Sequence, residues 1–353
     1  MRTVKKCLVV LLGIVLTLML LGGCTGGGNN GRPQALPIPE PSPPALTVLL
    51  PSTAETAADK PARLGFSQLG SESTWREANT ASIREAAEEA GITLLLKNAE
   101  QDQQKQFEAI RSFIRSGVDV IAIAPVVQTG WEPILLEIKQ AGIPVIILDR
   151  SVNVPDSSLY VTFIGSDFYE EGVKAAKYVR DKMRHHNGEI RIAELQGTVG
   201  STPSIDRGRG FRKMLDDQPN LQITLSAPAD FTRSGGHEVM KTFLQQPKEQ
   251  WPQVLYSHND DMAIGAVEAI KEAGLVPGED IIIVSVDGTR RAFEQMVAGS
   301  INAVVECNPL LGPLLTQAVK EIMAGRTLPK RMVTPEDIYT RELAAMEINN
   351  RKY

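Results

Sequence analysis

Carboxylates, amides and guanidinium groups recur at the ends of apolar runs along this sequence. The clearest pair is Asp149-Arg150, which follows directly after the run Ile143–Leu148. In open α/β sheets, ligands bind outside the carboxyl ends of the strands, so this pair is placed to hold a small polar molecule. An ion pair that merely closes a strand is the alternative for these two residues alone. Similar polar groups occur at Ser67–Arg76, Asp206-Arg207, His258–Asp261 and Asp287-Gly288.

Together, these residue types suit a ligand that is rich in hydroxyl groups. Sugar hydroxyls donate and accept hydrogen bonds, and carboxylates, amides and guanidinium forks match both roles. The C–H face of a sugar ring needs an apolar plate, for which Trp75 is the candidate. The candidate charges balance, with Glu72, Asp149 and Asp287 opposing Arg76, Arg150 and Arg207. A nearly neutral pocket favours an uncharged polyol over a phosphate or a sugar acid, which would need surplus cations.

Each candidate also has a purely structural explanation. Trp75 at a helix start suits a core position, and Arg207 suits a solvated helix face. One residue of Asn259–Asp261 suits the N-cap of the following helix. Asp287-Gly288 is a common turn pair. The site hypothesis therefore depends on the joint occurrence of these residues at strand ends.

Apolar runs alternate with amphipathic stretches from Arg63 onward, which predicts buried strands separated by helices. In one such stretch, Phe107, Ile110 and Ile114 share one helical face. The predicted strands are Leu64–Ser67, Ile92–Leu96, Val118–Ala124, Ile143–Leu148, Leu159–Ile164, Glu189–Leu195, Leu221–Leu225, Val254–Ser257, Ile281–Val286 and Ile301–Val305. The predicted helices are Trp75–Ala90, Gln103–Ser116, Trp131–Ala141, Tyr169–Met183, Ile205–Leu215, Gly236–Leu244, Met262–Ala273, Arg291–Val297 and Leu311–Met323.

This alternation predicts right-handed βαβ units and parallel sheets covered on both faces. The βα pairs are too many for one compact sheet and occur in two successive sets. The sequence therefore predicts an α/β fold of two similar doubly wound parallel-sheet lobes with a cleft between them. The formal net charge of −5, without a basic stripe, argues against a nucleic-acid partner.

The N-terminal segment has the pattern of a secretory signal. A basic start, Met1–Lys6, precedes the apolar run Leu8–Leu21. The sequence Leu21-Gly22-Gly23-Cys24 resembles the lipobox of bacterial lipoproteins, which implies cleavage after residue 23 and lipidation of Cys24. A plain secretory signal cut nearby is the alternative. Residues 24–62 are rich in Gly and then Pro, which predicts a tether between the membrane and the fold.

Cysteine usage gives little further chemistry. Cys7 lies in the predicted signal and Cys24 would carry lipid, so Cys307 alone remains in the mature chain. An intramolecular disulfide is then impossible, and a lone Cys307 suits a small buried position. The sequence shows no metal-ligand spacing, and we expect no cofactor and no metal.

Several longer motifs make the chain resemble the periplasmic sugar-binding proteins of ABC importers, of the ribose/galactose type. The resemblance runs from about Arg63 to Leu328. It is closest to the galactofuranose-binding branch, because of Gly65–Gln68, Gly70–Ser73, Ala124–Val127 and Thr129–Pro133. The motifs shared with the wider family are Asp149-Arg150, Glu194–Gly197, Asp206–Phe211, Ala229–Phe231, Asn259–Met262 and Val286–Gly288.

The resemblance implies a type I periplasmic-binding-protein fold, with a three-strand hinge near Gly165-Ser166, Cys307-Asn308 and Thr327-Leu328. The implied N-terminal lobe spans 63–165 and 307–328, and the C-terminal lobe spans 166–306 and 329–347. The family places a second aromatic where this chain has Arg76, and a hinge glutamine near Cys307, where Glu306 or Asn308 is the alternative. The implied ligand-binding residues are Ser71, Glu72, Trp75, Arg76, Asp149, Arg150, Arg207, Asn259, Asp287 and Asn308.

The function implied is that of a lipid-anchored, monomeric receptor outside the cytoplasmic membrane, which closes on a monosaccharide and delivers it to a membrane permease. A sensor that feeds a chemoreceptor or sensor kinase is the main alternative. A transcription repressor of the same fold would need a helix-turn-helix ahead of Arg63, where the signal and tether stand. A glycoside hydrolase would need two free carboxyl groups, whereas Asp149 pairs most naturally with Arg150. We therefore do not expect this protein to be an enzyme.

Overall fold

The computed structural model describes residues 60–353. The predicted signal, 1–23, and Cys24 with the tether up to residue 59 lie outside the described residues. Within the described part, no helix is both long enough and apolar enough to cross a membrane.

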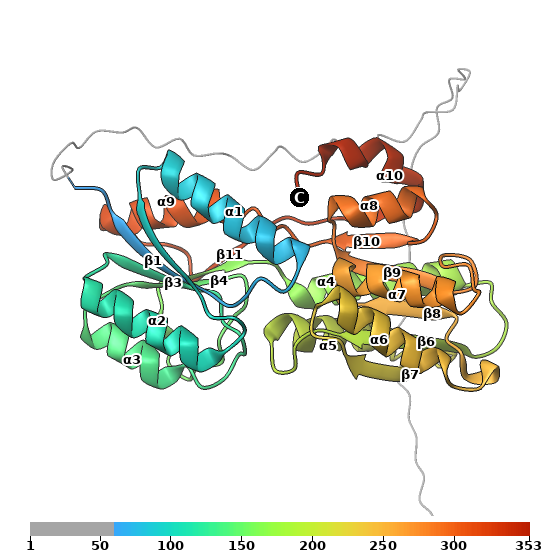
Figure 1. The fold of residues 1–353 in the computed structure, drawn as a ribbon. Coiled ribbons are helices and arrows are strands. Elements are labelled where there is room, and N and C mark those ends of the chain that lie inside the picture. The colour runs from blue at the N-terminus through green and yellow to red at the C-terminus, as the bar shows by residue number, and fades with distance from the viewer. Residues whose placement is uncertain (1–59) are drawn as a thin grey trace, which may run out of the picture. The chain divides into compact units, whose positions relative to one another are not determined.

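The first lobe is a six-stranded parallel sheet with helices on both faces (Figure 1). Its strand order is β11-β5-β4-β3-β1-β2. The strands are β1 (Arg63–Gln68), β2 (Thr93–Asn98), β3 (Val120–Ile123), β4 (Val145–Leu148), β5 (Thr162–Gly165) and β11 (Arg331–Val333). The helices are α1 (Thr74–Glu89), α2 (Gln103–Ser116), α3 (Glu132–Gln140), the short η1 (Ser157–Leu159) and α9 (Gly312–Met323).

The second lobe repeats this arrangement, with strand order β12-β10-β9-β8-β6-β7. All its strand pairs are parallel except β10 with β12. The strands are β6 (Ile190–Gln196), β7 (Leu221–Pro228), β8 (Val254–Ser257), β9 (Ile282–Asp287), β10 (Ala303–Glu306) and β12 (Ile338–Thr340). The helices are α4 (Phe168–Met183), α5 (Thr202–Leu215), α6 (Arg233–Leu244), η2 (Lys248–Gln250), α7 (Asp260–Glu272), α8 (Arg290–Val297), α10 (Arg341–Glu347) and η3 (Ile348–Asn350).

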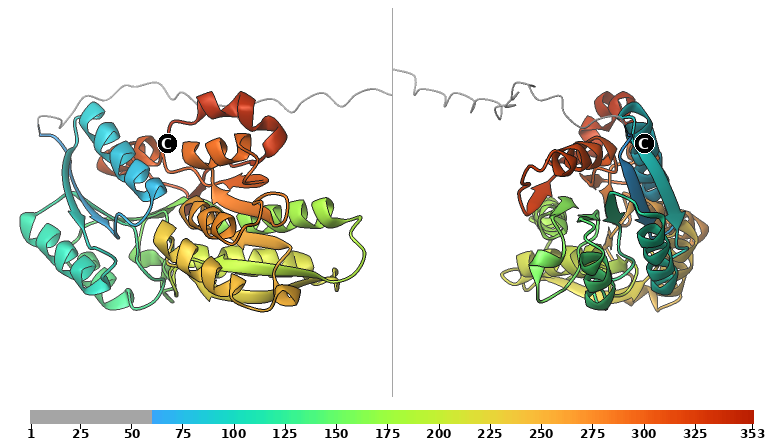
Figure 2. Two further views of the ribbon diagram at one scale, coloured as in Figure 1. Left: turned by 45° about the vertical axis from the view of Figure 1, so that its right-hand side comes forward. Right: turned by 90° about the vertical axis from the view of Figure 1, so that its left-hand side faces the viewer.

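The central strands of both sheets are apolar on both faces, which confirms the predicted fold class. All four residues of β3 and of β4 are buried, as expected for parallel strands covered by helices. Helix α9, late in the sequence, lies beside α1 in the first lobe (Figures 1 and 2). Gly312 makes this contact possible, because a Cβ atom there would meet the Ser82 carbonyl oxygen at 2.1 Å.

The chain crosses between the lobes three times. The crossings after β5 and after β10 lie where Gly165-Ser166 and Cys307-Asn308 predicted them. The third crossing corrects the prediction of Thr327-Leu328. Strand β11 still pairs with β5 of the first sheet, so residues 331–333 belong to the first lobe and the chain crosses between β11 and β12. Two of the three residues of β11 are exposed, so no apolar run marked it in the sequence.

Candidate ligand-binding site

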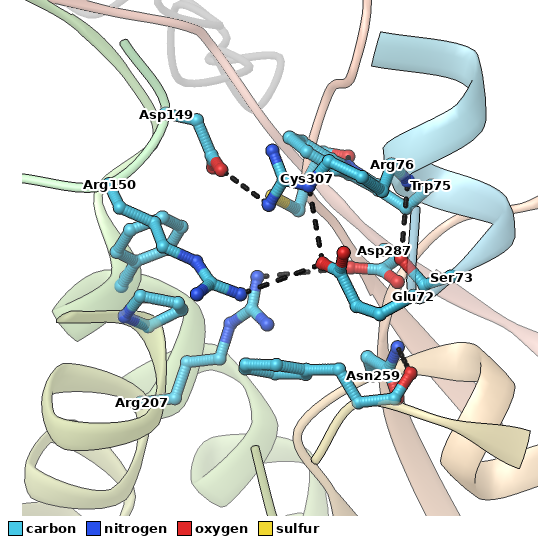
Figure 3. A pocket seen from close by; sticks show the side chains of 13 residues that line it. Glu72, Ser73, Trp75, Arg76, Asp149, Arg150, Arg207, Asn259, Asp287 and Cys307 are labelled. Atoms are coloured by element: carbon cyan, nitrogen blue, oxygen red, sulfur yellow. Dashed lines mark hydrogen bonds and ion pairs between the residues drawn. The ribbon is translucent and has the colours of Figure 1, made fainter. Parts of the chain in front are cut away.

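Side chains from both lobes line one cavity at the carboxyl ends of the strands (Figure 3). The strand order places it where β1 and β3, and likewise β6 and β8, are parallel neighbours, so the direction in which successive strands are added to the sheet reverses there. Such switch points are where open α/β sheets bind ligands. The lining residues are Glu72, Ser73, Trp75, Arg76, Asp149, Arg150, Phe168, Pro203, Arg207, Phe231, Asn259, Asp287 and Cys307.

The first lobe contributes two acids and two bases that pair with one another. Arg76 Nη2 lies 2.6 Å from Asp149 Oδ2, and Arg76 Nε donates to Glu72 Oε1 at 3.2 Å. Arg150 Nη2 is 3.7 Å from the same Glu72 oxygen, and Arg150 Nη1 donates to the Val126 carbonyl at 2.9 Å. The expected pairing of Asp149 with Arg150 is therefore wrong. Asp149 has a left-handed backbone conformation with φ of 61°, and this turn after β4 sends the two side chains to different partners.

The pKa values of these first-lobe side chains reflect both their burial and the charged groups close to them. Burial disfavours the ionised form of Glu72, but Arg76 and Arg150 outweigh it and lower the pKa of that carboxyl. Burial likewise disfavours the charged form of Arg76, yet Asp149 and Glu72 raise its pKa. Burial and the nearby Arg76 lower the pKa of Arg150 to about 10. All three groups remain ionised near neutral pH.

Trp75 forms an apolar wall of the cavity. It occupies the first turn of α1, after Ser73 caps the helix by accepting from Arg76 N at 3.2 Å. The indole N–H donates to the carbonyl of Cys307 at 2.6 Å, which fixes the ring against the second crossing. The Arg76 guanidinium lies 4.7 Å from the indole ring centre, within cation–π range. Trp75 is therefore both buried and part of the site.

The second lobe presents Arg207 from α5. Its Nε donates to Glu171 Oε2 and its Nη1 to the His258 carbonyl, both at 2.6 Å. Its Nη2 is 3.8 Å from Asp287 Oδ1. Burial disfavours the charged form of Arg207, but Glu171 outweighs it and raises the pKa. Glu171 thus orients Arg207 from outside the cavity. The strand-end pattern does not indicate Glu171, because it lies within α4, next to Glu170, and not in a loop after a strand.

Asp287 is held in an uncommon backbone conformation. Its φ is 130°, and Asp149 has φ of 61°. Non-glycine residues with positive φ are uncommon and gather at functional sites. Burial, and then the nearby Asp260, raise the pKa of Asp287 well above its usual range. Asp287 therefore holds its proton to a higher pH than an exposed aspartate does.

Asn259 combines a capping role with a place in the cavity wall. Its Oδ1 accepts from Met262 N at 3.0 Å at the start of α7, which confirms the predicted N-cap among Asn259–Asp261. Its Nδ2 donates to the Phe231 carbonyl at 3.1 Å. The neighbouring Asp260 accepts from the backbone N–H groups of Gly288 and Thr289. Asp260 therefore fixes the loop that carries Asp287.

Two aromatic residues were not predicted to belong to the site. Phe231 lies 5.2 Å below the Arg150 guanidinium and 5.9 Å from that of Arg207. Phe168 lies 5.1 Å from the Arg207 guanidinium. Phe231 follows the end of β7 and Phe168 follows the end of β5. The search for polar residues after strand ends, which indicated Asp149 and Asp287, therefore passed over these two apolar side chains.

Two residues predicted to contact the ligand do not line the cavity. Ser71 is exposed, because the chain turns into α1 and brings Ser73 inward in its place. Asn308 points elsewhere, with its Oδ1 accepting from Leu310 N at 2.9 Å. Cys307 lines the cavity at the second crossing. The eight other predicted residues are all in the cavity wall.

The cavity is closed, and its polar atoms are incompletely paired. The open space between the side chains is about 20 Å³, room for about one water molecule. A larger ligand therefore enters only when the lobes separate and the side chains move. Within residues 60–353, five atoms of the cavity wall are buried without a hydrogen-bond partner, namely Glu72 Oε2, Arg76 Nη1, Asp149 Oδ2, Arg150 Nε and Asp287 Oδ2. Asp149 Oδ2 is in ion-pair contact with Arg76 without an aligned hydrogen bond.

Such unpaired atoms indicate that a polar partner is expected there. Each buried donor or acceptor without a partner costs about 1–3 kcal/mol. Donors and acceptors are both represented, so a molecule bearing several hydroxyl groups would satisfy them together.

Glu171, Cys307 and Glu336 have ligand-type atoms within 4.8 Å of one another, but the group suits a metal ion poorly. Burial raises the pKa of the Cys307 thiol well above its usual range, and metals bind the thiolate. Glu171 is already engaged by Arg207.

Comparison with known proteins places this geometry in context. A model of the periplasmic binding protein domain matches residues 64–327. The galactofuranose-binding protein YtfQ of Escherichia coli (strain K12) is 43% identical over 295 residues, covering 83% of this chain and 92% of that protein.

Two solved structures are similar over the same region. One, from Mycobacterium smegmatis in complex with β-D-fucofuranose, is 49% identical, covers 83% of this chain and 95% of that chain, and has a TM-score of 0.81. The other is the periplasmic binding protein of the arabinose ABC transporter from Shewanella sp. ANA-3, bound to α- and β-L-arabinofuranose. It is 47% identical, covers 82% and 96% of the two chains, and has a TM-score of 0.80.

Proposed function

The chain belongs to the periplasmic binding protein family, and from that premise we propose that it is the sugar receptor of an ABC importer. Its ligand is a neutral monosaccharide in the furanose form. The observation that carries the proposal is the closed cavity in which unpaired donors and acceptors converge from both lobes. The relative from Escherichia coli is named for galactofuranose, and the two solved structures contain bound furanose sugars.

The charges of the cavity support a neutral ligand. Three guanidinium groups line it. Even where Asp287 keeps its proton, Glu72, Asp149 and Glu171, which pairs with Arg207, oppose these three charges. A sugar acid or phosphate would therefore leave a negative charge unbalanced. Glu72, Arg76, Asp149 and Arg150 would bind hydroxyls from the first lobe, with Trp75 against the ring. Arg207, Asn259 and Asp287 would bind from the second.

Thermal unfolding of the purified protein with D-galactose, D-fucose, L-arabinose, D-ribose, D-fructose and D-galacturonate tests this proposal. A ligand at about a thousand times its Kd should add about 4 kcal/mol to the free energy of unfolding. We expect a response to at least one of the first three sugars and none to galacturonate. No response to any neutral sugar would contradict the proposal.

The ring form needs a second measurement. Freshly dissolved crystalline D-galactose is pyranose and forms furanose only as it equilibrates. If the furanose is bound, the fresh solution should give a weaker initial response than the equilibrated one. Equal responses from both would mean that the cavity takes the pyranose.

We also infer that the receptor is lipid-anchored through Cys24 on the outer face of the cytoplasmic membrane, and that it acts as a monomer with a membrane permease. The anchor is supported by the sequence Leu21–Cys24 alone. A Cys24→Ser variant should lose lipid labelling and leave the membrane fraction. A membrane-bound, labelled variant would refute the anchor.

A further inference from the structure

The three segments that cross between the lobes meet at one carboxylate. Glu336 Oε1 accepts from Ser166 Oγ at 2.5 Å in the first crossing and from Asn308 N at 3.0 Å in the second. It also accepts from Thr334 Oγ1 at 2.8 Å in its own, third crossing. A single oxygen atom therefore joins the three parts of the hinge.

The loop that carries Glu336 is also bonded to both lobes. Thr334 N donates to the Gly165 carbonyl at 3.1 Å, at the end of β5 in the first lobe. On the second-lobe side, Glu306 N donates to the Asp337 carbonyl at 2.7 Å. Lys174 Nζ of α4 donates to the backbone carbonyl of Glu336 at 2.5 Å. The carboxylate is thus held in place relative to each sheet.

A short path links Glu336 to the cavity, although Glu336 does not line it. Carboxylate oxygens of Glu336 and Glu171 and the sulfur of Cys307 lie within 4.8 Å of one another. Glu171 in turn accepts from Arg207 Nε at 2.6 Å. A change at the hinge carboxylate therefore reaches the guanidinium group of the second lobe through one intervening residue.

Away from the hinge, the lobes meet at backbone amides that report closure. Thr74 N donates to Asp261 Oδ2 at 2.7 Å, Gln128 N to the Gly200 carbonyl at 2.9 Å, and Ser151 N to Thr202 Oγ1 at 3.1 Å. In each pair the donor belongs to the first lobe and the acceptor to the second. These three amides lose their partners when the lobes separate.

From these contacts, we propose that Glu336 is a positioning residue for sugar binding. It ties the three crossings in the arrangement that brings the two halves of the cavity together. The inference rests on the proposed sugar-binding function for its affinity readout but not for its closure readout. Affinity for the sugar therefore depends on a side chain that never touches it.

The test compares Glu336→Ala, Glu336→Gln and Asp337→Asn in the full chain. Glutamine keeps an acceptor for the three donors, whereas alanine removes it. Asp337 is the exposed neighbour, and its variant makes the same replacement of a carboxyl group by an amide without touching the hinge contacts. Calorimetry with equilibrated D-galactose gives affinity, and hydrogen exchange at Thr74, Gln128 and Ser151 gives closure.

We expect Glu336→Ala to weaken D-galactose binding about tenfold, as for lost hydrogen bonds to a buried carboxyl group. The three amides should exchange faster, while Glu336→Gln and Asp337→Asn stay close to wild type. Wild-type affinity and exchange in Glu336→Ala would overturn the proposal. If that variant does not fold, Thr334→Val decides, since it removes one of the three donors. Faster exchange then supports the proposal and unchanged exchange overturns it.

Wild-type protein that binds none of the sugars would refute the proposed function but leave the exchange comparison intact. Exchange at the three amides in the absence of sugar then decides the role of Glu336 by itself.

Discussion

Ion pairs at the cavity are arranged so that none of the charged groups is left alone. Arg76 lies between Asp149 and Glu72, and Arg207 lies between Glu171 and Asp287. Buried charges are tolerated only when paired and hydrogen-bonded. Individual atoms of these groups still lack hydrogen-bond partners. The hydroxyls of a ligand would supply those partners, and this favours binding.

Replacing Asp149 with Ala should abolish sugar binding while the fold is retained. The substitution removes an acceptor for hydroxyls and the 2.6 Å partner of Arg76. Two lost charge-assisted hydrogen bonds correspond to a fall in affinity of at least about a hundredfold. Calorimetry measures the affinity and circular dichroism the fold. Asp217→Ala, at an exposed position, is the control, and near-wild-type affinity in Asp149→Ala would contradict the assignment.

Replacing Gly197 with Ala should weaken binding without touching any polar group. A Cβ atom there would lie 1.8 Å from the Phe231 ring, so the ring must move away from Arg150. We expect a loss of about 1–3 kcal/mol in stability from overpacking, together with lower sugar affinity. Gly188→Ala serves as a comparison for affinity, because it strains the backbone at a φ of 101° while its Cβ would meet nothing within 4 Å. Equal affinities in the two variants would mean that the position of Phe231 is unimportant.

Loops after strands, and the helices that they start, hold these side chains in place. Ser73 and Asn259 cap α1 and α7 and face the same cavity. Asp260 accepts from the hydroxyl of Ser285 within β9, and from two backbone N–H groups and the hydroxyl of Thr289 in the loop after it. Helix starts and strand ends therefore share one edge of each sheet, which is why the site lies there.

The hinge loop should make stability depend on pH through Glu336. Burial, and then the nearby Glu171, raise the pKa of Glu336 from 4.5 to about 8. The other groups that face it are Lys174 and Cys307. Between these two pH values the folded protein keeps a proton that the unfolded chain releases. The free energy of unfolding should therefore fall as the pH rises from 4.5 to 8.

Urea unfolding at pH 5 and pH 8.5 measures this fall. Glu336→Gln cannot titrate, so its stability should fall less than that of the wild type over the same interval. Other buried carboxyl groups titrate alike in both proteins. Parallel losses in the two proteins would show that Glu336 does not hold the proton.

At the scale of the whole molecule, binding and closure are one event. The cavity is closed, so a sugar reaches it only from an open form, and the contacts across the cleft form after entry. A ligand that bonds to both lobes stabilises the closed form by its differential affinity for the two states. The three crossings make that movement a rotation about the hinge.

Removing a closing contact should lower affinity without altering the cavity wall. Asp261 accepts from the backbone N–H and the hydroxyl of Thr74 across the cleft and does not line the cavity. We expect Asp261→Ala to weaken sugar binding by about three- to tenfold, mainly through faster dissociation. Stopped-flow fluorescence measures both rate constants. An unchanged dissociation rate would mean that this contact does not hold the closed form.

Much of this protein could be predicted from its sequence. Hydrophobic periodicity predicted the two sets of βα units, because buried parallel strands and amphipathic helices need those patterns wherever they pack. Strand ends predicted eight residues of the cavity wall, since parallel strands bring their carboxyl ends to one edge.

Only the tertiary structure decided which charged side chains pair with one another and which side chains turn into the cavity. Which guanidinium group meets Asp149, and whether Ser71 or Ser73 turns inward, depends on side-chain directions at turns that no periodicity encodes. Strand β11 has three residues and is mostly exposed, so it lacks the apolar run that would predict a strand from the sequence. Glu171 acquires its role from Arg207, 36 residues away in the chain, and Glu336 from Ser166, 170 residues away. The sequence determined which strand ends face the cleft, and packing across three crossings determined which side chains turn inward and which of them touch.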